Sequence, residues 1–352
     1  MLDDMLSGGA PKITSSTSLT FGAWAADWLS RRRCKGATVT NYEIAVRVHL
    51  APRWGKVRLL SISKSSIETW VQEMEASPSL ANSTADGHWR VFKMIMKDAF
   101  QNGKISKNPT YEVSGPYVSK TVSHVFTLDE CWAIHDALPD RYRPILMLGF
   151  ACGTRQAEAL GLCIDAIDFK HEVLTVRRQS LRTKETGHKQ ILVDRLKTSP
   201  SLPTKVAPIP PYLQEALREH IERFPPLPTT TVLWEHRKTI DTCERGPVRA
   251  VFTSSFDNLV DRNHFTQSVW RPTLTKLGIR DAAGKIPTFH DLRHTFISTC
   301  LQNAIPEHTV AQWVGDSVEQ LRRTYSHLLK DHVETYGAVI AGLTMRPPMR
   351  VS

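Results

Sequence analysis

The sequence lacks any stretch that could cross a membrane. Its longest apolar run without a charged residue, residues 144–154, has 11 residues, far below the roughly 20 that a membrane-spanning helix needs. The N-terminal residues Met1–Met5 are acidic and contain no apolar run, so they do not form a secretory signal peptide. The chain also has no internal repeat and no low-complexity tract. These absences exclude membrane, secreted and repeat proteins and predict a soluble intracellular chain.

Cysteine is scarce and scattered along the chain. The six cysteines form no Cys-x-x-Cys pair and have no ligating histidine nearby: Cys34, Cys131, Cys152, Cys163, Cys243 and Cys300. Neither a zinc site nor a disulfide framework fits that spacing. We therefore expect reduced, mostly buried thiols and no metal held by cysteine.

Positive charge exceeds negative charge. Among 352 residues, 45 Lys and Arg stand against 35 Asp and Glu, a formal net charge of +10. Apolar residues make up 41% and charged residues 23%, which excludes a wholly disordered chain. Residues 20–118 hold 14 Lys and Arg against 8 Asp and Glu, whereas residues 119–352 hold 30 against 25. The denser positive charge of the N-terminal third would suit a polyanionic partner, although an ordinary solvated surface explains it equally well.

The N-terminal third has the pattern of a small helical domain. Phe21, Trp24 and Trp28 recur at helical spacing on one face. The pattern predicts four helices, at residues 19–33, from Thr38 to near Pro52, at 63–74 and at 83–101. We assign residues 1–18 to a flexible tail, 19–118 to this all-α domain, 119–125 to a linker and 126–352 to a second domain.

The second domain mixes helices and strands. Thr127 and Glu130 form a capping-box pattern that opens a helix, and residues 143–152 predict a buried helix. Two strands are expected at 172–179 and 190–196, joined by a turn at 186–188, with a third at 206–209 and mainly helix from Pro211 onward. The fold class is therefore α+β: a small all-α domain and a mostly helical domain with a short antiparallel sheet.

Two clusters place arginine at the start of a helix. In Gly153–Leu162, Arg155 begins a helix and Glu158 follows one turn later on the same face. Such an arginine can direct its fork at an oxyanion, although a structural Arg155–Glu158 pair is the simpler interpretation of this cluster alone. In Thr288–Phe296, Thr288 and Asp291 form a second capping-box pattern.

The helix that begins at Thr288 carries the stronger signal. His290, Arg293 and His294 share one face of it, and arginine beside imidazole suits binding and acid–base chemistry at a phosphate. A metal site at His290 and His294 lacks a third ligand. A third cluster, residues 313–327, contains Tyr325, which taken alone is a half-buried packing residue.

Taken in order, these clusters resemble the tyrosine recombinases, the phage-integrase family. Gly153, Arg155, Glu158 and Leu162 fill the family's Gly-x-Arg-x-x-Glu-x-x-x-Leu box, and residues 290–296 fill its His-x-x-Arg box. Gly315 and Asp316 stand where the family has Gly-His, and Tyr325 follows nine residues later. The N-terminal helices are similar to the family's core-binding domain, on Thr38, Tyr42 and His49–Pro52. The resemblance covers residues 19 to 345.

The resemblance implies a role for each matching residue. Tyr325 would attack the scissile phosphate and form a 3′-phosphotyrosyl link. Arg155 and Arg293 would clamp the non-bridging oxygens, and His290 would activate Tyr325 or bind the phosphate. The remaining members are Glu158 and His294 as supporting groups and Lys197, in Leu196–Ser199, as the hairpin lysine that protonates the leaving 5′-oxygen. Lys205 is the competing choice for that lysine.

The resemblance also implies the partners. It implies double-stranded DNA with inverted-repeat core sites, a homotetramer on DNA whose apolar segment 336–343 docks onto a neighbour, and accessory DNA-bending or excision factors. No cofactor, metal or membrane is implied, and the setting is the cytoplasm of a bacterial host. Two alternatives remain: strand relaxation like that of a type IB topoisomerase, and a DNA-binding protein whose site has decayed at Asp316.

Asp316 is the main departure from the family pattern. An ionised carboxylate about 5 Å from a phosphate would repel it by roughly 3 kcal/mol at an effective dielectric near 20. Asp316 is therefore predicted to be turned away, protonated, or neutralised by a cation such as Arg322, Arg323 or His294.

Overall fold

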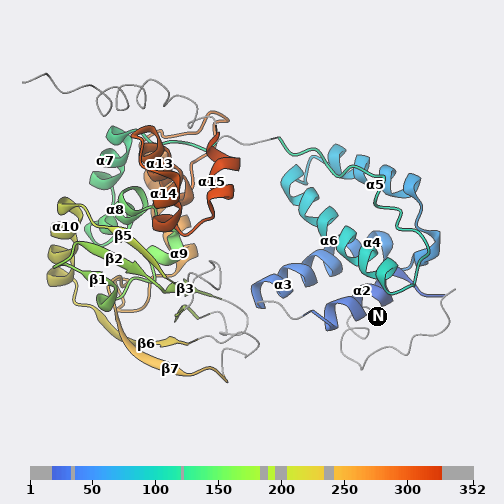
Figure 1. The fold of residues 1–352 in the computed structure, drawn as a ribbon, viewed down its shortest axis with the longest axis horizontal. Helices are drawn as coiled ribbons and strands as arrows, with labels where there is room; N and C mark the ends of the chain where they lie inside the picture. The colour runs from blue at the N-terminus through green and yellow to red at the C-terminus, as the bar shows by residue number, and fades with distance from the viewer. Residues whose placement is uncertain are drawn as a thin grey trace, which may run out of the picture. The chain divides into compact units, whose positions relative to one another are not determined.

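The computed structural model describes residues 18–32, 36–119, 123–182, 189–194, 204–233 and 242–326. The chain divides between residues 121 and 122 into two compact units (Figure 1). Lys197, the predicted turn at 186–188 and the apolar segment 336–343 lie outside the described residues. Among the described residues, no helix is long and apolar enough to cross a membrane.

The N-terminal unit is built from helices. Its elements are α2 (Phe21–Ser30), α3 (Gly36–Ile44), the π-helix η1 (Ala45–Leu50), α4 (Ala51–Trp54), the 3₁₀ turn η2 (Leu59–Ser61), α5 (Lys64–Ala76) and α6 (Asn82–Gln101). Thr20 caps α2, because its side chain accepts a hydrogen bond from the Ala23 N–H.

The predicted end of the second helix is confirmed. The helix was expected to stop near Pro52, and the helical chain runs from α3 through η1 and α4 and ends at Trp54. Pro52 lies in the first turn of α4, where its missing N–H and fixed φ are tolerated.

Aromatic rings fill the interior of the N-terminal unit. Phe21 and Phe92 stack with ring centroids 5.2 Å apart, and Trp54 meets Trp70 edge-on at 5.7 Å. All four side chains are almost fully buried. Such pairs add directional stabilisation to the burial of large apolar surfaces, so this core stabilises the unit without a buried ion pair among its described residues.

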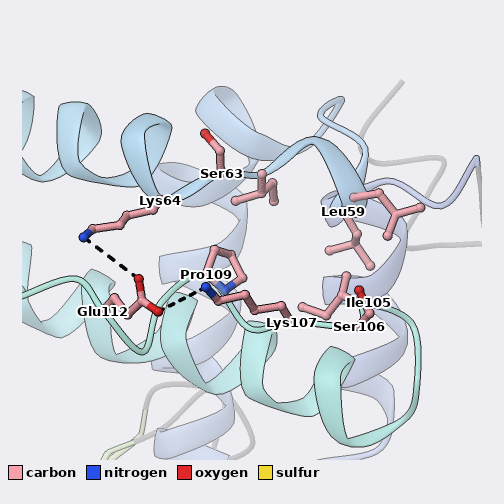
Figure 2. A pocket seen from close by; sticks show the side chains of 10 residues that line it. Leu59, Ser63, Lys64, Ile105, Ser106, Lys107, Pro109 and Glu112 are labelled. Atoms are coloured by element: carbon pink, nitrogen blue, oxygen red, sulfur yellow. Dashed lines mark ion pairs between the residues drawn. The ribbon is translucent and has the colours of Figure 1, made fainter.

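A small cavity lies at the surface of this unit, between η2, the start of α5 and the segment after α6. Figure 2 shows its lining, which encloses about 270 Å³. The Glu112 carboxylate lies 3.1 Å from Lys107 Nζ and 4.0 Å from Lys64 Nζ. The two lysines are therefore partnered by a side chain of the same unit.

The C-terminal unit combines helices with two small sheets. Its helical elements are α7 (Leu128–Ala137), η3 (Asp140–Tyr142), α8 (Arg143–Cys152), α9 (Gln156–Ala159), η4 (Ile164–Ala166), α10 (Pro211–Arg223), α11 (Arg262–His264), η6 (Phe265–Trp270), α12 (Arg271–Lys276), α13 (Phe289–Gln302), α14 (Glu307–Val314) and α15 (Val318–Tyr325). Both predicted capping boxes are confirmed, at Thr127 with Glu130 and at Thr288 with Asp291. The buried helix at 143–152 is confirmed with its predicted bounds.

The strands form two sheets instead of one. They are β1 (Ile167–Asp168), β2 (Val173–Val176), β3 (Gln179–Leu181), β4 (Ile191–Val193), β5 (Lys205–Pro208), β6 (Leu227–Val232) and β7 (Arg245–Ala250). An antiparallel sheet has the order β1-β2-β5, and a mixed sheet has the order β3-β4-β6-β7 with β4 and β6 parallel.

Two strand predictions therefore need correction. The strand expected at 172–179 is divided at residues 177–178 into β2 and β3, which belong to different sheets. The region after Pro211 is mainly helical as expected, but it also contains β6 and β7, which were not predicted. Pro247 is tolerated in β7 because that strand is at the edge of its sheet. Proline in this part of the chain was expected to end helices, but here it lies within a strand.

Helix packing brings the ends of several elements together. Figure 1 shows α13, α14 and α15 at one end of the C-terminal unit, with α9 nearby. Helix α8 packs against α13, and α14 packs against β5. A Cβ on Gly149 of α8 would come within 2.8 Å of Leu292 on α13, so glycine permits this close approach.

Candidate active site

Arg155 is positioned by the sharp turn that ends α8. Gly153 has φ 61, the left-handed conformation that glycine adopts at low cost. A Cβ there would come within 2.6 Å of the Phe296 ring. After this turn, the Arg155 backbone N–H donates to Glu158 Oε2 over 2.9 Å and Arg155 Nη1 donates to Glu158 Oε1 over 3.0 Å. The predicted pairing of Arg155 with Glu158 is confirmed.

Arg293 lies inside the unit on α13. Asp291 fixes the start of that helix, because its Oδ2 accepts from the Thr288 N–H and hydroxyl, each over 2.7 Å. Two residues later, Arg293 Nη1 donates to the Gly153 carbonyl over 2.8 Å, and its side chain is 2% exposed. The contact ties α13 to the turn that carries Arg155.

Asp316 lies between the two arginines. Its Oδ1 is 2.6 Å from Arg155 Nη2, and its Oδ2 is 2.6 Å from Arg293 Nη2. Burial alone would raise the pKa of Asp316, but Arg293 and Arg155 hold it below its usual value. The carboxylate is therefore ionised at neutral pH.

The predicted partners of Asp316 are corrected by these contacts. The carboxylate is neutralised by Arg155 and Arg293 instead of Arg322, Arg323 or His294. Arg322 pairs with Glu307 at 2.7 Å. Residues 155 and 316 lie 161 positions apart in the sequence. Spacing along the chain does not show that such distant residues meet, so the contact could not be predicted from it.

Lys205 extends the cluster on its buried side. Its ammonium group pairs with Glu158 Oε2, and both side chains are almost fully buried. Burial lowers the pKa of Lys205 to about 7, although the charge of Glu158 opposes this shift. Basic and acidic groups alternate along the cluster in the order Lys205, Glu158, Arg155, Asp316, Arg293.

The position of Lys205 has a signal in the sequence. Lys205 is in phase with the inward-facing Ala207 on β5, and a lysine in such a position needs a buried partner. From the sequence, Lys205 was only the competing choice to Lys197 for the hairpin lysine. The contact of Lys205 with Glu158 was not predicted.

Tyr325 is at the end of α15. Its side chain is buried, and its hydroxyl is in hydrogen-bond contact with His294 Nδ1. Burial raises the pKa of Tyr325 well above its usual value. Burial also lowers the pKa of His294, so the imidazole is neutral near pH 7. A neutral imidazole in contact with a phenol can accept its proton.

His290 lies one helical turn before His294. The two rings meet edge-on with centroids 4.9 Å apart. Desolvation, followed by the charges of His294, Arg293 and Arg155, lowers the pKa of His290. Of the two histidines, His294 is the one in contact with Tyr325. Among the described residues, no group of three or more His, Cys, Asp or Glu side chains could hold a metal ion.

The structure thus brings together seven of the eight predicted site residues. Ion pairs join four of them: Glu158, Arg155, Asp316 and Arg293. The other three contact one another, Tyr325 through His294 and His294 through His290, and the charges of Arg293 and Asp316 act on the pKa of Tyr325. Lys197 lies outside the described residues.

A family model and several curated proteins match this chain. Residues 124–332 match the model of the phage integrase family. The prophage phiRv2 integrase of Mycobacterium tuberculosis is 24% identical over 335 residues, covering 94% of this chain and 80% of the relative. The tyrosine recombinase XerD of Corynebacterium glutamicum is 22% identical, covering 88% of this chain and 93% of the relative.

Solved structures share the fold. The Tn1549 transposon integrase in complex with transposon right end DNA has a TM-score of 0.74 at 19% identity, covering 92% of this chain and 100% of that chain. A lambda integrase dimer bound to a core site has a TM-score of 0.62 at 16% identity, covering 94% of this chain and 84% of that chain. A lambda integrase tetramer bound to a Holliday junction has a TM-score of 0.61 at 16% identity, covering 90% and 84%.

Proposed function

We propose roles for the residues of this cluster from one premise: the chain belongs to the phage integrase family and is a DNA strand-exchange enzyme of the tyrosine recombinase type. Its activity is site-specific DNA recombination, in which strands are cleaved and rejoined. The observation that carries the assignment of roles is the convergence of two arginines, at the N-cap of α9 and on α13, with a buried tyrosine at the end of α15 on which the charge of Arg293 acts.

Tyr325 is the nucleophile in this proposal. Its phenolic oxygen attacks the scissile phosphorus, the bond from phosphorus to the 5′-oxygen breaks, and the 3′-phosphate becomes esterified to Tyr325. The phenolic proton passes to His294, which is in contact with the hydroxyl and is neutral near pH 7. The bond energy is kept in the phosphotyrosyl link, so rejoining needs no ATP.

Arg155 and Arg293 stabilise the charge that develops on the non-bridging oxygens. Preorganised donors of this kind contribute most when their geometry is fixed in advance. Glu158 fixes the guanidinium of Arg155, and the Gly153 carbonyl fixes that of Arg293. His290, beside both arginines, contacts the phosphate.

Lys197 is proposed as the acid that protonates the departing 5′-oxygen. The ammonium of Lys205 is almost fully buried and is used by Glu158, so it supports Glu158 from behind and does not reach a bound strand. Lys205 is thus a positioning residue, because it acts through Glu158 on Arg155.

Duplex DNA is the proposed substrate, with inverted core sites and four copies of the chain in the working assembly. The support comes from the positive charge of the chain, +10 overall, and from fold neighbours that are named as a dimer on a core site and a tetramer on a Holliday junction. Accessory DNA-bending or excision factors complete the proposal. Integration or excision of a phage or mobile element is the biological setting that suits the integrase relatives. Domain boundaries at 19–118, 119–125 and 126–352, after a tail at 1–18, belong to this proposal.

Two other functions are less well supported. Strand relaxation like that of a topoisomerase would use the same residue types, but the family match is to integrases. A decayed site is disfavoured because Asp316 is integrated into the arginine pair by two short ion pairs.

The test is covalent trapping on a nicked DNA substrate with Tyr325→Phe. This change removes the hydroxyl and keeps the ring, so DNA binding should persist while the protein–DNA adduct disappears. Tyr142→Phe is the matched control, because Tyr142 is also buried in the C-terminal unit, against Phe265. It should form a normal adduct. An adduct of normal yield from Tyr325→Phe would assign the nucleophile elsewhere, with Tyr336 the next residue to map.

A further inference from the structure

The Asp316 carboxylate occupies the space between the two arginines. The guanidinium groups of Arg155 and Arg293 each direct an Nη2 donor at a different oxygen of the same carboxylate, at 2.6 Å in both cases. The Arg293 side chain is 2% exposed, and that of Arg155 is 27% exposed. In this arrangement, Asp316 holds donors that a bound oxyanion would need.

A carboxylate is a close chemical equivalent of the ligand that the proposed function assigns to this pair. The two non-bridging oxygens of a phosphodiester share one negative charge and accept hydrogen bonds from arginine in the same forked way as carboxylate oxygens do. Asp316 has that charge and those acceptors at the required place. It also stands where the family has histidine, a donor.

We propose that Asp316 is an internal stand-in for the scissile phosphate, which holds Arg155 and Arg293 in the chain alone and releases them to a phosphodiester when DNA binds. This inference rests on the proposed function, because it takes the two arginines as the phosphate clamp. It goes beyond that function by stating that, in each cleavage event, the phosphodiester replaces the Asp316 carboxylate on the two arginines.

Because of charge repulsion, the arginine pair can hold either the Asp316 carboxylate or a phosphate, but not both together. With Asp316 ionised, the five groups from Lys205 to Arg293 sum to a single positive charge when Lys205 is protonated and to zero when it is not. A phosphate placed beside the carboxylate would meet direct repulsion between like charges in a partly buried site. Withdrawal of Asp316 removes that repulsion and frees one donor on each arginine.

The backbone at Asp316 suits a side chain that changes place. Gly315 has φ 65 and ends α14, and Ser317 caps α15 by accepting from the Gln320 N–H over 3.1 Å. Asp316 lies in the short turn between two helices, and its backbone N–H donates to the Ala311 carbonyl of α14 over 3.1 Å. The exchange is therefore a rotation of the Asp316 side chain on a fixed backbone, beside the start of the helix that carries Tyr325.

The test measures sulfate binding to the full-length chain by its effect on thermal unfolding, with chloride at equal ionic strength as the salt control. Asp316→Asn keeps the shape of the side chain and removes its charge. It should bind sulfate at least about a hundredfold more tightly than the parent, because repulsion between two unit charges across some 5 Å at an effective dielectric near 20 already corresponds to that factor and sulfate carries two charges.

Asp165→Asn is the matched control. Asp165 also pairs with two arginines, Arg177 and Arg178, and lies outside the cluster of Asp316. It should bind sulfate as the parent does. Equal sulfate affinity in Asp316→Asn and the parent would overturn the proposal, and so would an equal gain in Asp165→Asn. Retained tight binding in Asp316→Asn combined with Arg293→Ala would also overturn it, because the sulfate would then lie outside the arginine pair.

A DNA measurement separates this inference from the proposed function. The DNA concentration for half-maximal cleavage should fall in Asp316→His, which removes the competing anion, with the single-turnover rate equal to or above that of the parent. Adduct formation by the parent together with an unchanged half-maximal concentration would overturn the exchange and leave the function intact. Tight sulfate binding by Asp316→Asn without any adduct from the parent would overturn the function and leave the exchange standing.

Discussion

The two units of this chain use charge in opposite ways. The N-terminal unit fills its interior with aromatic rings and keeps its ion pairs at the surface, as with Glu112 between two lysines. The C-terminal unit buries Lys205, Glu158 and Arg293 together. Exposed ion pairs contribute at most about 1 kcal/mol, whereas a buried charge that loses its partner costs several. Aromatic packing alone therefore builds the core of one unit, and under the proposed function the buried charges of the other unit position the two arginines.

The largest effect should follow from removing one of the two buried or half-buried arginines. Losing one preorganised charge-stabilising group lowers the rate by about 10²–10³, or roughly 3–4 kcal/mol. Arg293→Ala and Arg155→Ala should each slow single-turnover cleavage at least that much. Arg155→Lys should be a poor substitute, because lysine cannot pair with Glu158 and Asp316 through one planar fork. Cleavage by Arg155→Lys at close to the parent rate would argue against direct contact with the phosphate.

The next effect distinguishes the two lysines. Lys197→Ala should slow cleavage by about 10², the lower end of the range for a lost general acid. A substrate with sulfur at the 5′-bridging position should restore it, because a thiolate leaves without a proton. Lys205→Ala should also slow cleavage, through the loss of the partner of Glu158, but sulfur should not restore it. Rescue of Lys205→Ala by sulfur would make Lys205 the acid.

Local patterns in the sequence predicted much of this molecule. The caps at Thr127 and Thr288 and the buried helix at 143–152 depend on residues within one or two turns of each other. Such signals are complete in the sequence itself, so they could be predicted without the fold.

Features that depend on distant contacts were not predictable in the same way. The division of the strand at 172–179 follows from pairing with β5 on one side and β4 on the other. The pairing of Asp316 with Arg155 joins positions 161 residues apart. Neither periodicity nor spacing contains that information. The three threonines of β6, Thr229–Thr231, were a usable strand signal, but the neighbouring prolines were taken as helix breaks.

A core substitution in the N-terminal unit tests whether aromatic packing stabilises this unit more than its surface ion pairs do. Phe92 is fully buried against Phe21, Trp54 and Trp70. Phe92→Ala should reduce the free energy of unfolding of this unit by about 3–5 kcal/mol, the usual loss for a deleted core ring. Arg53→Ala, which breaks the exposed pair with Glu73, should cost less than about 1 kcal/mol. Denaturant unfolding followed by tryptophan fluorescence measures both. Equal losses would refute the claim that aromatic packing, and not surface charge, stabilises this unit.

The last effect concerns a buried group of the C-terminal unit that is kept neutral. His220 is 4% exposed, its ring lies 5.0 Å from Phe252, and its Nε2 is 3.2 Å from the Val251 carbonyl oxygen. Burial lowers the pKa of His220 to about 4, from 6.5 in an unstructured chain. The unfolded chain therefore binds the extra proton first as pH falls. The stability that the neutral ring contributes is fully present above pH 6.5 and is lost as pH falls toward 4, by roughly 3 kcal/mol at most.

The measurement is the free energy of unfolding of the parent and of His220→Gln at pH 7.5 and at pH 5. Glutamine keeps a donor near the Val251 carbonyl but cannot take up a proton in this range. The parent should therefore lose more stability than the variant between the two pH values, since subtraction cancels the titration of all other groups. An equal loss in both proteins would mean that His220 titrates normally in the folded chain. The interior of the C-terminal unit would then tolerate a charged side chain that takes no part in the proposed reaction, against the contrast drawn between the two units.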